Sequence, residues 1–238
     1  MPDLDVSERG HTLIAKVQRR DDNEFTSEMI SKLSRVVRDA RAHPSLRFVR
    51  ICAVGNVFCG GRERTGSSPE ELRAEAERIV DLYETLRASP LTIVAEVNGD
   101  AAGFGVGLVA ASDIAVASTE ARFWFPEILG GLAPTVVISW LVHTLSYKAA
   151  FDLVTTSEPI DAQRAASWGL ITEAVPRNGL EARVNERIEG LAALSAPALR
   201  EVKEFFAATR GMDPPSAATA SINALTVSAI RVESERAR

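Results

Sequence analysis

The stretch at residues 97–108, VNGDAAGFGVGL, constrains the fold of this chain more than any other. An apolar run beginning at Leu91 leads into it, and small residues that fit a helix follow it. A strand that turns through glycines into a helix leaves backbone N–H groups without acceptors, and such a point suits a developing negative charge. Gly103 and Gly105 approach a dinucleotide fingerprint, but Gly107 comes one residue too early for it. The turn therefore indicates an anion-stabilising site or, alternatively, close helix–strand packing without a ligand.

Composition narrows the classes of function. The chain has 238 residues, of which 46% are hydrophobic, and this is enough for one full core. Its net charge of −5 provides no broad basic face, so we expect no nucleic-acid partner. No apolar run is long enough to span a bilayer and the N-terminus has no signal pattern, so we expect no membrane partner and a cytoplasmic protein. The two cysteines and three scattered histidines suggest buried thiols and no metal site.

Residues 1–133 have an α/β pattern. Helices are predicted from Thr26 or Ser27 to a stop at Pro44 and over 69–88, and strands over 11–17, 46–54, 91–97, 113–117 and 121–127. This alternation implies a parallel sheet with right-handed crossovers. Residues 134–238 form a second, helical region. Helices are predicted there over 136–143, 146–155, 162–168, 180–193, 197–209 and 216–238, interrupted by an extended piece at 169–175.

Four stretches carry motifs in a characteristic order. They are DNEFTSE at 22–28, NVFCGGRE at 56–63, the block at 98–128 with NGxAxGxG, DIAVAS and PEI, and AxxAxxxGLI followed by VP at 162–176. On these motifs the chain resembles the crotonase superfamily, the enoyl-CoA hydratases and isomerases, over nearly its whole length. The resemblance implies an α/β fold with a crotonase-like ββα spiral core over 1–133. It also implies a C-terminal helical region over 134–238 for oligomerisation and pocket closure.

The resemblance implies an acyl-CoA thioester as substrate, no separate cofactor, and a homotrimer or hexamer. The thioester carbonyl becomes an enolate-like oxyanion held by two backbone N–H groups. By position these belong to Arg62, just after Gly61, and to Phe104, just after Gly103. Each preorganised donor is typically worth ~3–4 kcal/mol in the transition state. Backbone donors do not depend on side-chain type, although Phe104 is expected to narrow the pocket.

Further residues near these loops are candidates for substrate binding. The set is Gly61, Gly103, Trp124 and Arg64. Alternatively, Arg64 and its neighbours form a solvated loop, and Trp124 is a packing residue. Asn23 and Lys203 are interpreted as a turn and a surface residue, and Cys59 as a buried thiol because no histidine partner accompanies it.

The proton chemistry departs from the family pattern. Hydratases of the family use two carboxylates; the second corresponds to Glu127, but the first corresponds to Gly107, which has no side chain. Asp100 lies on the wrong side of the turn, and Glu96 is expected within a strand. A single carboxylate suffices to move a double bond, because it transfers one proton between two carbons. Apolar neighbours, including Trp124, are expected to raise the pKa of Glu127.

The favoured function is therefore single-base Δ3/Δ2 enoyl-CoA isomerisation, with Glu127 as acid and base. Hydration with an unusual water-positioning group, decarboxylation, and thioester hydrolysis are alternatives that use the same oxyanion hole. A non-catalytic acyl-CoA-binding homologue is an alternative from another class. The tail departs from the family's ending, so a lid over the CoA is expected to be incomplete or supplied by a neighbouring subunit.

Overall fold

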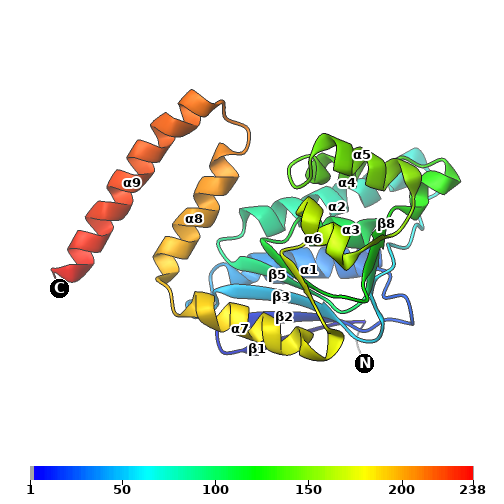
Figure 1. Ribbon diagram of the computed structural model, residues 1–238, viewed down its shortest axis with the longest axis horizontal. Coiled ribbons are helices and arrows are strands. Elements are labelled where there is room, and N and C mark those ends of the chain that lie inside the picture. The colour runs from blue at the N-terminus through cyan, green and yellow to red at the C-terminus, as the bar shows by residue number, and fades with distance from the viewer. Residues whose placement is uncertain (1–2, 238) are drawn as a thin grey trace.

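The computed structural model describes residues 3–237 and contains two β-sheets flanked by helices (Figure 1). The larger sheet has the order β1 (Leu4–Arg9), β2 (Thr12–Val17), β3 (Phe48–Ala53), β5 (Thr92–Val97), β7 (Ile114–Ser118) and β10 (Glu173–Val175). The smaller sheet has the order β4 (Val57–Cys59), β6 (Asp100–Ala102), β8 (Arg122–Trp124) and β9 (Ile160–Asp161).

The strands follow a spiral that visits the two sheets in turn. The chain passes from β3 to β4, from β5 to β6 and from β7 to β8, so each pass adds one strand to each sheet. Strands β2, β3, β5, β7 and β10 pair in parallel, which confirms the predicted parallel sheet, and β1 pairs with β2 in an antiparallel manner. The sequence reading missed β1, β4 and β6, which are short or largely polar.

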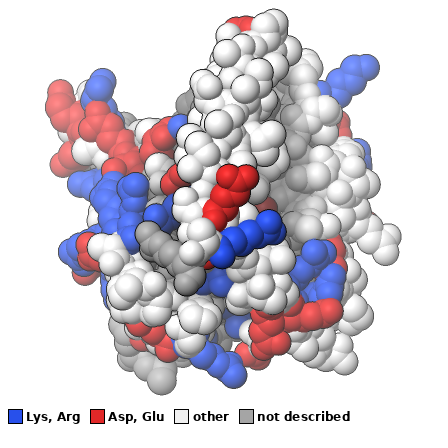
Figure 2. Space-filling view, turned by 90° about the vertical axis from the view of Figure 1, so that its left-hand side faces the viewer, with Lys and Arg blue, Asp and Glu red and all other residues white. Residues whose placement is uncertain are grey.

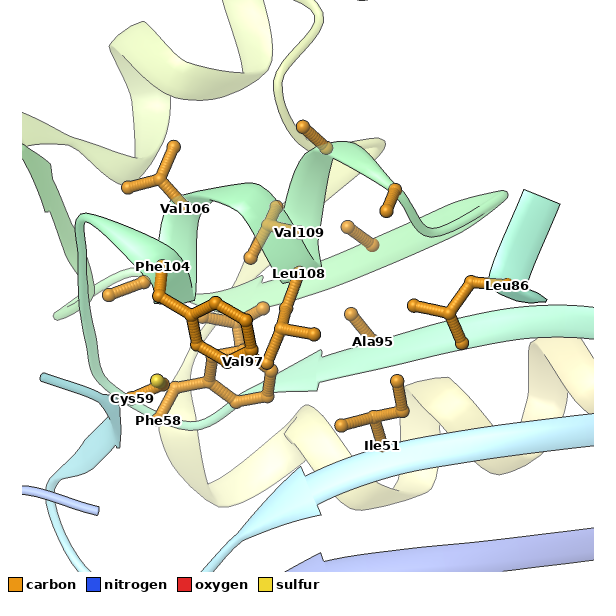
Figure 3. Packing of buried hydrophobic residues seen from close by; sticks show 14 of the residues in the cluster. Ile51, Phe58, Cys59, Leu86, Ala95, Val97, Phe104, Val106, Leu108 and Val109 are labelled. Atoms are coloured by element: carbon orange, nitrogen blue, oxygen red, sulfur yellow. The ribbon is translucent and has the colours of Figure 1, made fainter. Parts of the chain in front are cut away.

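Helices cover both faces of the larger sheet. On one face lie α1 (Ser27–Ala40), α2 (Pro69–Ala88) and α3 (Phe104–Ala110), which share the main core with alternate strand residues such as Ile51 and Ala95. On the other face α7 (Leu180–Ala192) packs against Phe48, Val94 and Val116. Successive strand residues point to opposite faces, and this explains why these strands are almost wholly apolar. Figure 3 shows Phe104 and Leu108 of α3 directed toward the sheet beside Phe58 and Val97.

The predicted helix starts agree with the caps. Thr26 accepts a hydrogen bond from the Met29 N–H and caps α1. Ser68 and Glu71 form a reciprocal capping box at the start of α2. The remaining helical elements are η1 (Pro126–Gly130), α4 (Thr135–Leu141), α5 (Tyr147–Thr156), α6 (Ala162–Trp168), η2 (Arg177–Gly179), α8 (Ala196–Thr209) and α9 (Pro214–Arg236).

Helices α8 and α9 form a hairpin that projects from the rest of the molecule (Figure 1). Neither helix has a buried residue, and the surface of the projecting part is mostly uncharged (Figure 2). Lys203 fastens α8 to the core: its Nζ donates to the carbonyls of Leu86 at 3.1 Å and Leu91 at 2.7 Å, and pairs with Asp113 at 2.7 Å. The interpretation of Lys203 as a surface residue is wrong, because its side chain is 11% exposed.

The division of the chain at residue 134 remains a prediction. The part after 134 is mainly helical, but it also supplies β9 to the smaller sheet and β10 to the larger one. Over residues 3–237, no helix combines the length and the apolar character needed to cross a membrane.

Candidate active site

Two glycine-led loops leave neighbouring strands of the smaller sheet at the same edge. The first follows β4 and runs through Gly61 to Arg62, and the second follows β6 and runs through Gly103 to Phe104. Because β4 and β6 are parallel neighbours, their carboxyl ends lie side by side. Gly61 has φ +140° and Gly103 has φ +50°, which are conformations that glycine adopts without strain. The backbone conformation therefore favours glycine at the position just before each expected N–H donor.

Each loop is anchored by backbone hydrogen bonds that leave the expected donors unused. The Phe25 N–H donates to the Gly61 carbonyl at 3.0 Å, and the Glu63 N–H donates to the Phe25 carbonyl at 2.9 Å. The Gly103 N–H donates to the Trp124 carbonyl at 3.0 Å. Within residues 3–237, the N–H groups of Arg62 and Phe104 donate to no protein acceptor. Two unused donors therefore stand at adjacent loops.

Glu75 of α2 anchors the first loop through hydrogen bonds. Its buried carboxylate accepts hydrogen bonds from the backbone of Thr65 at 2.9 Å and Gly66 at 2.7 Å, and from Arg62 Nη1 at 2.8 Å. Burial acts to raise the pKa of Glu75, but these hydrogen bonds outweigh it and lower the pKa to about 2. The Arg62 side chain thus faces inward toward Glu75. The alternative that these loop residues are solvated is therefore wrong for Arg62.

Glu127 lies at the first turn of η1, directly beside the second loop. A Cβ added at Gly103 would lie 1.9 Å from Glu127 Oε1, so the carboxylate occupies the space that the glycine leaves open. The Oε2 atom is buried and has no hydrogen-bond partner within residues 3–237. Burial raises the pKa of Glu127, although Arg62 lowers it in part, and this confirms the expected direction. The site thus holds a carboxylate that binds a proton more readily than an ordinary glutamate does.

The structure also shows what lies against Gly107, the position at which the family pattern places a second carboxylate. A Cβ added at Gly107 would lie 1.9 Å from Tyr83 Oη and 2.7 Å from Tyr83 Cζ. Tyr83 comes from α2 and is fully buried. Glu96 pairs with Arg50 and Asp100 with Arg122, so neither acid replaces the missing group. In the sequence Tyr83 is one of the apolar-face residues of the helix over 69–88, and no local pattern links it to the site.

The other candidate residues have these positions. Trp124 holds Gly103 through its carbonyl, and its ring lies beside the Arg122 guanidinium. Arg64 is exposed on the loop. Asn23 ends a turn with φ +50°, as predicted, and its buried side chain donates to the carbonyls of Val54 and Val57. Cys59 is buried, and burial raises the pKa of its thiol to about 12, which fits the expected inert thiol.

The spiral of paired sheets, with two glycine-led loops beside a half-buried glutamate, is a crotonase fold. An enoyl-CoA hydratase structure from Mycobacterium smegmatis matches it with a TM-score of 0.92 and 25% identity, over 96% of this chain and 91% of that one. The Enoyl-CoA hydratase/isomerase family model matches residues 9–234, and the chain belongs to this family.

Curated relatives agree with this assignment. Enoyl-CoA hydratase domain-containing protein 3, mitochondrial, from Xenopus laevis is 34% identical over 68% of this chain and 57% of its own length. A putative enoyl-CoA hydratase from Thermus thermophilus is 29% identical over 86% of this chain and 84% of its own. This chain thus spans less than two thirds of the frog relative. Because that relative is named mitochondrial, the cytoplasmic location stays a prediction.

Proposed function

We propose that this chain is an acyl-CoA enzyme that moves a double bond between the β,γ and α,β positions of an enoyl thioester. The observation that carries the proposal is the lone, half-buried carboxylate of Glu127, which lies against Gly103 and has a buried, unpartnered Oε2 atom. In this reaction Glu127 takes a proton from the α carbon and returns it to the γ carbon, so it ends as it began. No water enters the reaction, and no second carboxylate is required.

The negative charge develops on the thioester oxygen while the proton is on Glu127. The backbone N–H groups of Arg62 and Phe104 are the proposed donors to this oxygen, and each removed donor of this kind costs ~3–4 kcal/mol in the transition state. Their proposed role is supported by their unused hydrogen-bonding capacity and by the anchors that hold both loops. Gly61 and Gly103 are proposed to bring the backbone close to the thioester, with Trp124 and Arg64 flanking it.

Hydration is the second candidate, because the relatives from Thermus thermophilus and Rhodobacter capsulatus are named as enoyl-CoA hydratases. It would need a water-positioning group other than an acid at 107. The two reactions are separated by incubating the protein with a 3-enoyl-CoA and, separately, with a 2-enoyl-CoA. Isomerisation raises the absorbance of the conjugated thioester in the first mixture, whereas hydration lowers it in the second.

Glu127→Gln is expected to abolish the isomerisation, and Glu158→Gln, an exposed acid outside the site, is the matched control. Full activity of Glu127→Gln would refute the proposed mechanism. Consumption of the 2-enoyl-CoA without turnover of the 3-enoyl-CoA would favour hydration. Tight CoA binding without either reaction would favour a binding protein.

We also propose that the chain assembles as a homotrimer or a dimer of trimers. The support is the projecting α8–α9 hairpin, which exposes large apolar side chains. These include Val202, Phe206, Ile222, Leu225, Val227 and Ile230. Exposed large apolar side chains gathered on one projecting element are typical of a contact between subunits.

A further inference from the structure

Tyr83 lies at the candidate site but has no role in the proposed reaction. Its ring stacks on Phe104 with centroids 5.9 Å apart and meets Trp140 edge-on at 5.6 Å. Its Oη donates to the Phe104 carbonyl at 3.2 Å, and the negative charge of Glu127 acts on the Tyr83 hydroxyl. The phenol therefore lies against the residue that carries the expected oxyanion donor and against Gly107.

We propose that Tyr83 is the specificity-determining residue of the site, because its phenol takes the volume of a second carboxylate and leaves Glu127 to act alone. This inference rests on the proposed function, whose reaction it restricts. Any side chain at 107 would need its Cβ within 1.9 Å of Tyr83 Oη, and real Cβ contacts essentially never fall below 3.0 Å. Gly107 and Tyr83 are thus a matched pair, in which the glycine makes room for the phenol.

The chemical consequence follows from the charge of the group. Burial, together with the nearby Cys59 and Glu127, raises the pKa of Tyr83 well above its ordinary value, so the phenol stays neutral and protonated. A neutral phenol donates a hydrogen bond but does not take a proton from water. The preferred substrates are therefore enoyl thioesters whose conversion requires only proton transfer between carbons, and water addition is disfavoured.

The steric part is tested by thermal unfolding of a double-mutant cycle. Gly107→Ala is expected to lower the Tm by about 3–10 °C in the wild-type background and by clearly less in a Tyr83→Leu background, where the 3.2 Å contact of the added Cβ with Val137 Cγ1 remains. Gly190→Ala is the matched control, because it lies in α7 with nothing within 4 Å of an added Cβ, and its effect should be equal in both backgrounds. An equal Tm loss for Gly107→Ala in both backgrounds would overturn the proposal.

The catalytic part is tested with Gly107→Glu, Tyr83→Leu and the double variant. The ratio of 2-enoyl-CoA hydration to 3-enoyl-CoA isomerisation is expected to rise at least ~10-fold in the double variant over either single one. A folded double variant with an unchanged ratio, or equal hydration by Gly107→Glu alone, would overturn the assignment. If wild type lacks isomerase activity but the unfolding cycle shows coupling, the proposed function fails while the pairing of Tyr83 with Gly107 stands.

Discussion

Gly103→Ala probes the contact between the second loop and Glu127. The added methyl group would lie 1.9 Å from Glu127 Oε1, whereas real contacts of this kind stay above 3.0 Å, so the carboxylate or the loop must move by about 1.1 Å. A misplacement of about 1 Å in a catalytic group costs on the order of 10²-fold in rate. The substitution also places alanine at φ +50°, and such backbone strain costs about 1–3 kcal/mol of stability.

Gly10→Ala separates these two effects. Gly10 has φ +59° but nothing within 4 Å of an added Cβ, so it reports backbone strain alone. Both variants are expected to lower the Tm by about 2–10 °C, but only Gly103→Ala should lower the kcat for 3-enoyl-CoA isomerisation, by about 10²-fold. The absorbance assay and thermal unfolding measure the two quantities. Wild-type kcat in Gly103→Ala, or an equal loss of kcat in Gly10→Ala, would refute this reasoning.

Three further predictions concern acids and assembly. Because burial raises the pKa of Glu127, its base form is lost early on acidification, and kcat/KM should decrease as the pH falls through that raised pKa. The folded state also binds this proton more tightly than the unfolded state, so the ionised carboxylate destabilises the fold at high pH. Glu127→Gln should therefore have a higher Tm than wild type at about pH 8 and an equal Tm near pH 4. Glu75→Gln should reduce the free energy of unfolding at pH 7 by about 1.5–3 kcal/mol, whereas the exposed control Glu77→Gln should reduce it by under ~0.5 kcal/mol. The difference between the two variants should vanish as the pH falls from the ordinary glutamate range through about 2, because Glu75 then becomes protonated in the folded state. An equal effect of both substitutions at pH 7 would contradict this prediction. Leu225→Asp should convert an oligomer to smaller species in sedimentation velocity, and an unchanged sedimentation coefficient would count against the α8–α9 interface.

Much of the fold could be predicted from local pattern. Apolar strands, Pro stops and Ser or Thr caps predicted α1, α2, β3 and β5 closely, because these signals act within one turn or one strand. The missed strands β4 and β6 have three residues each and owe their form to pairing with each other. Lys203 also escaped prediction, because its burial depends on carbonyls more than a hundred residues away.

The sequence by itself determined the glycine positions and the single acid of the candidate site. Gly61 and Gly103 are required by the backbone conformation of their own residues, and Glu127 belongs to a motif read without any structure. Only the tertiary structure decided what replaces the second carboxylate at Gly107. A glycine reports that space is needed, but its occupant, Tyr83, comes from a helix 24 positions upstream, and packing of α2 against the turn brings the two together.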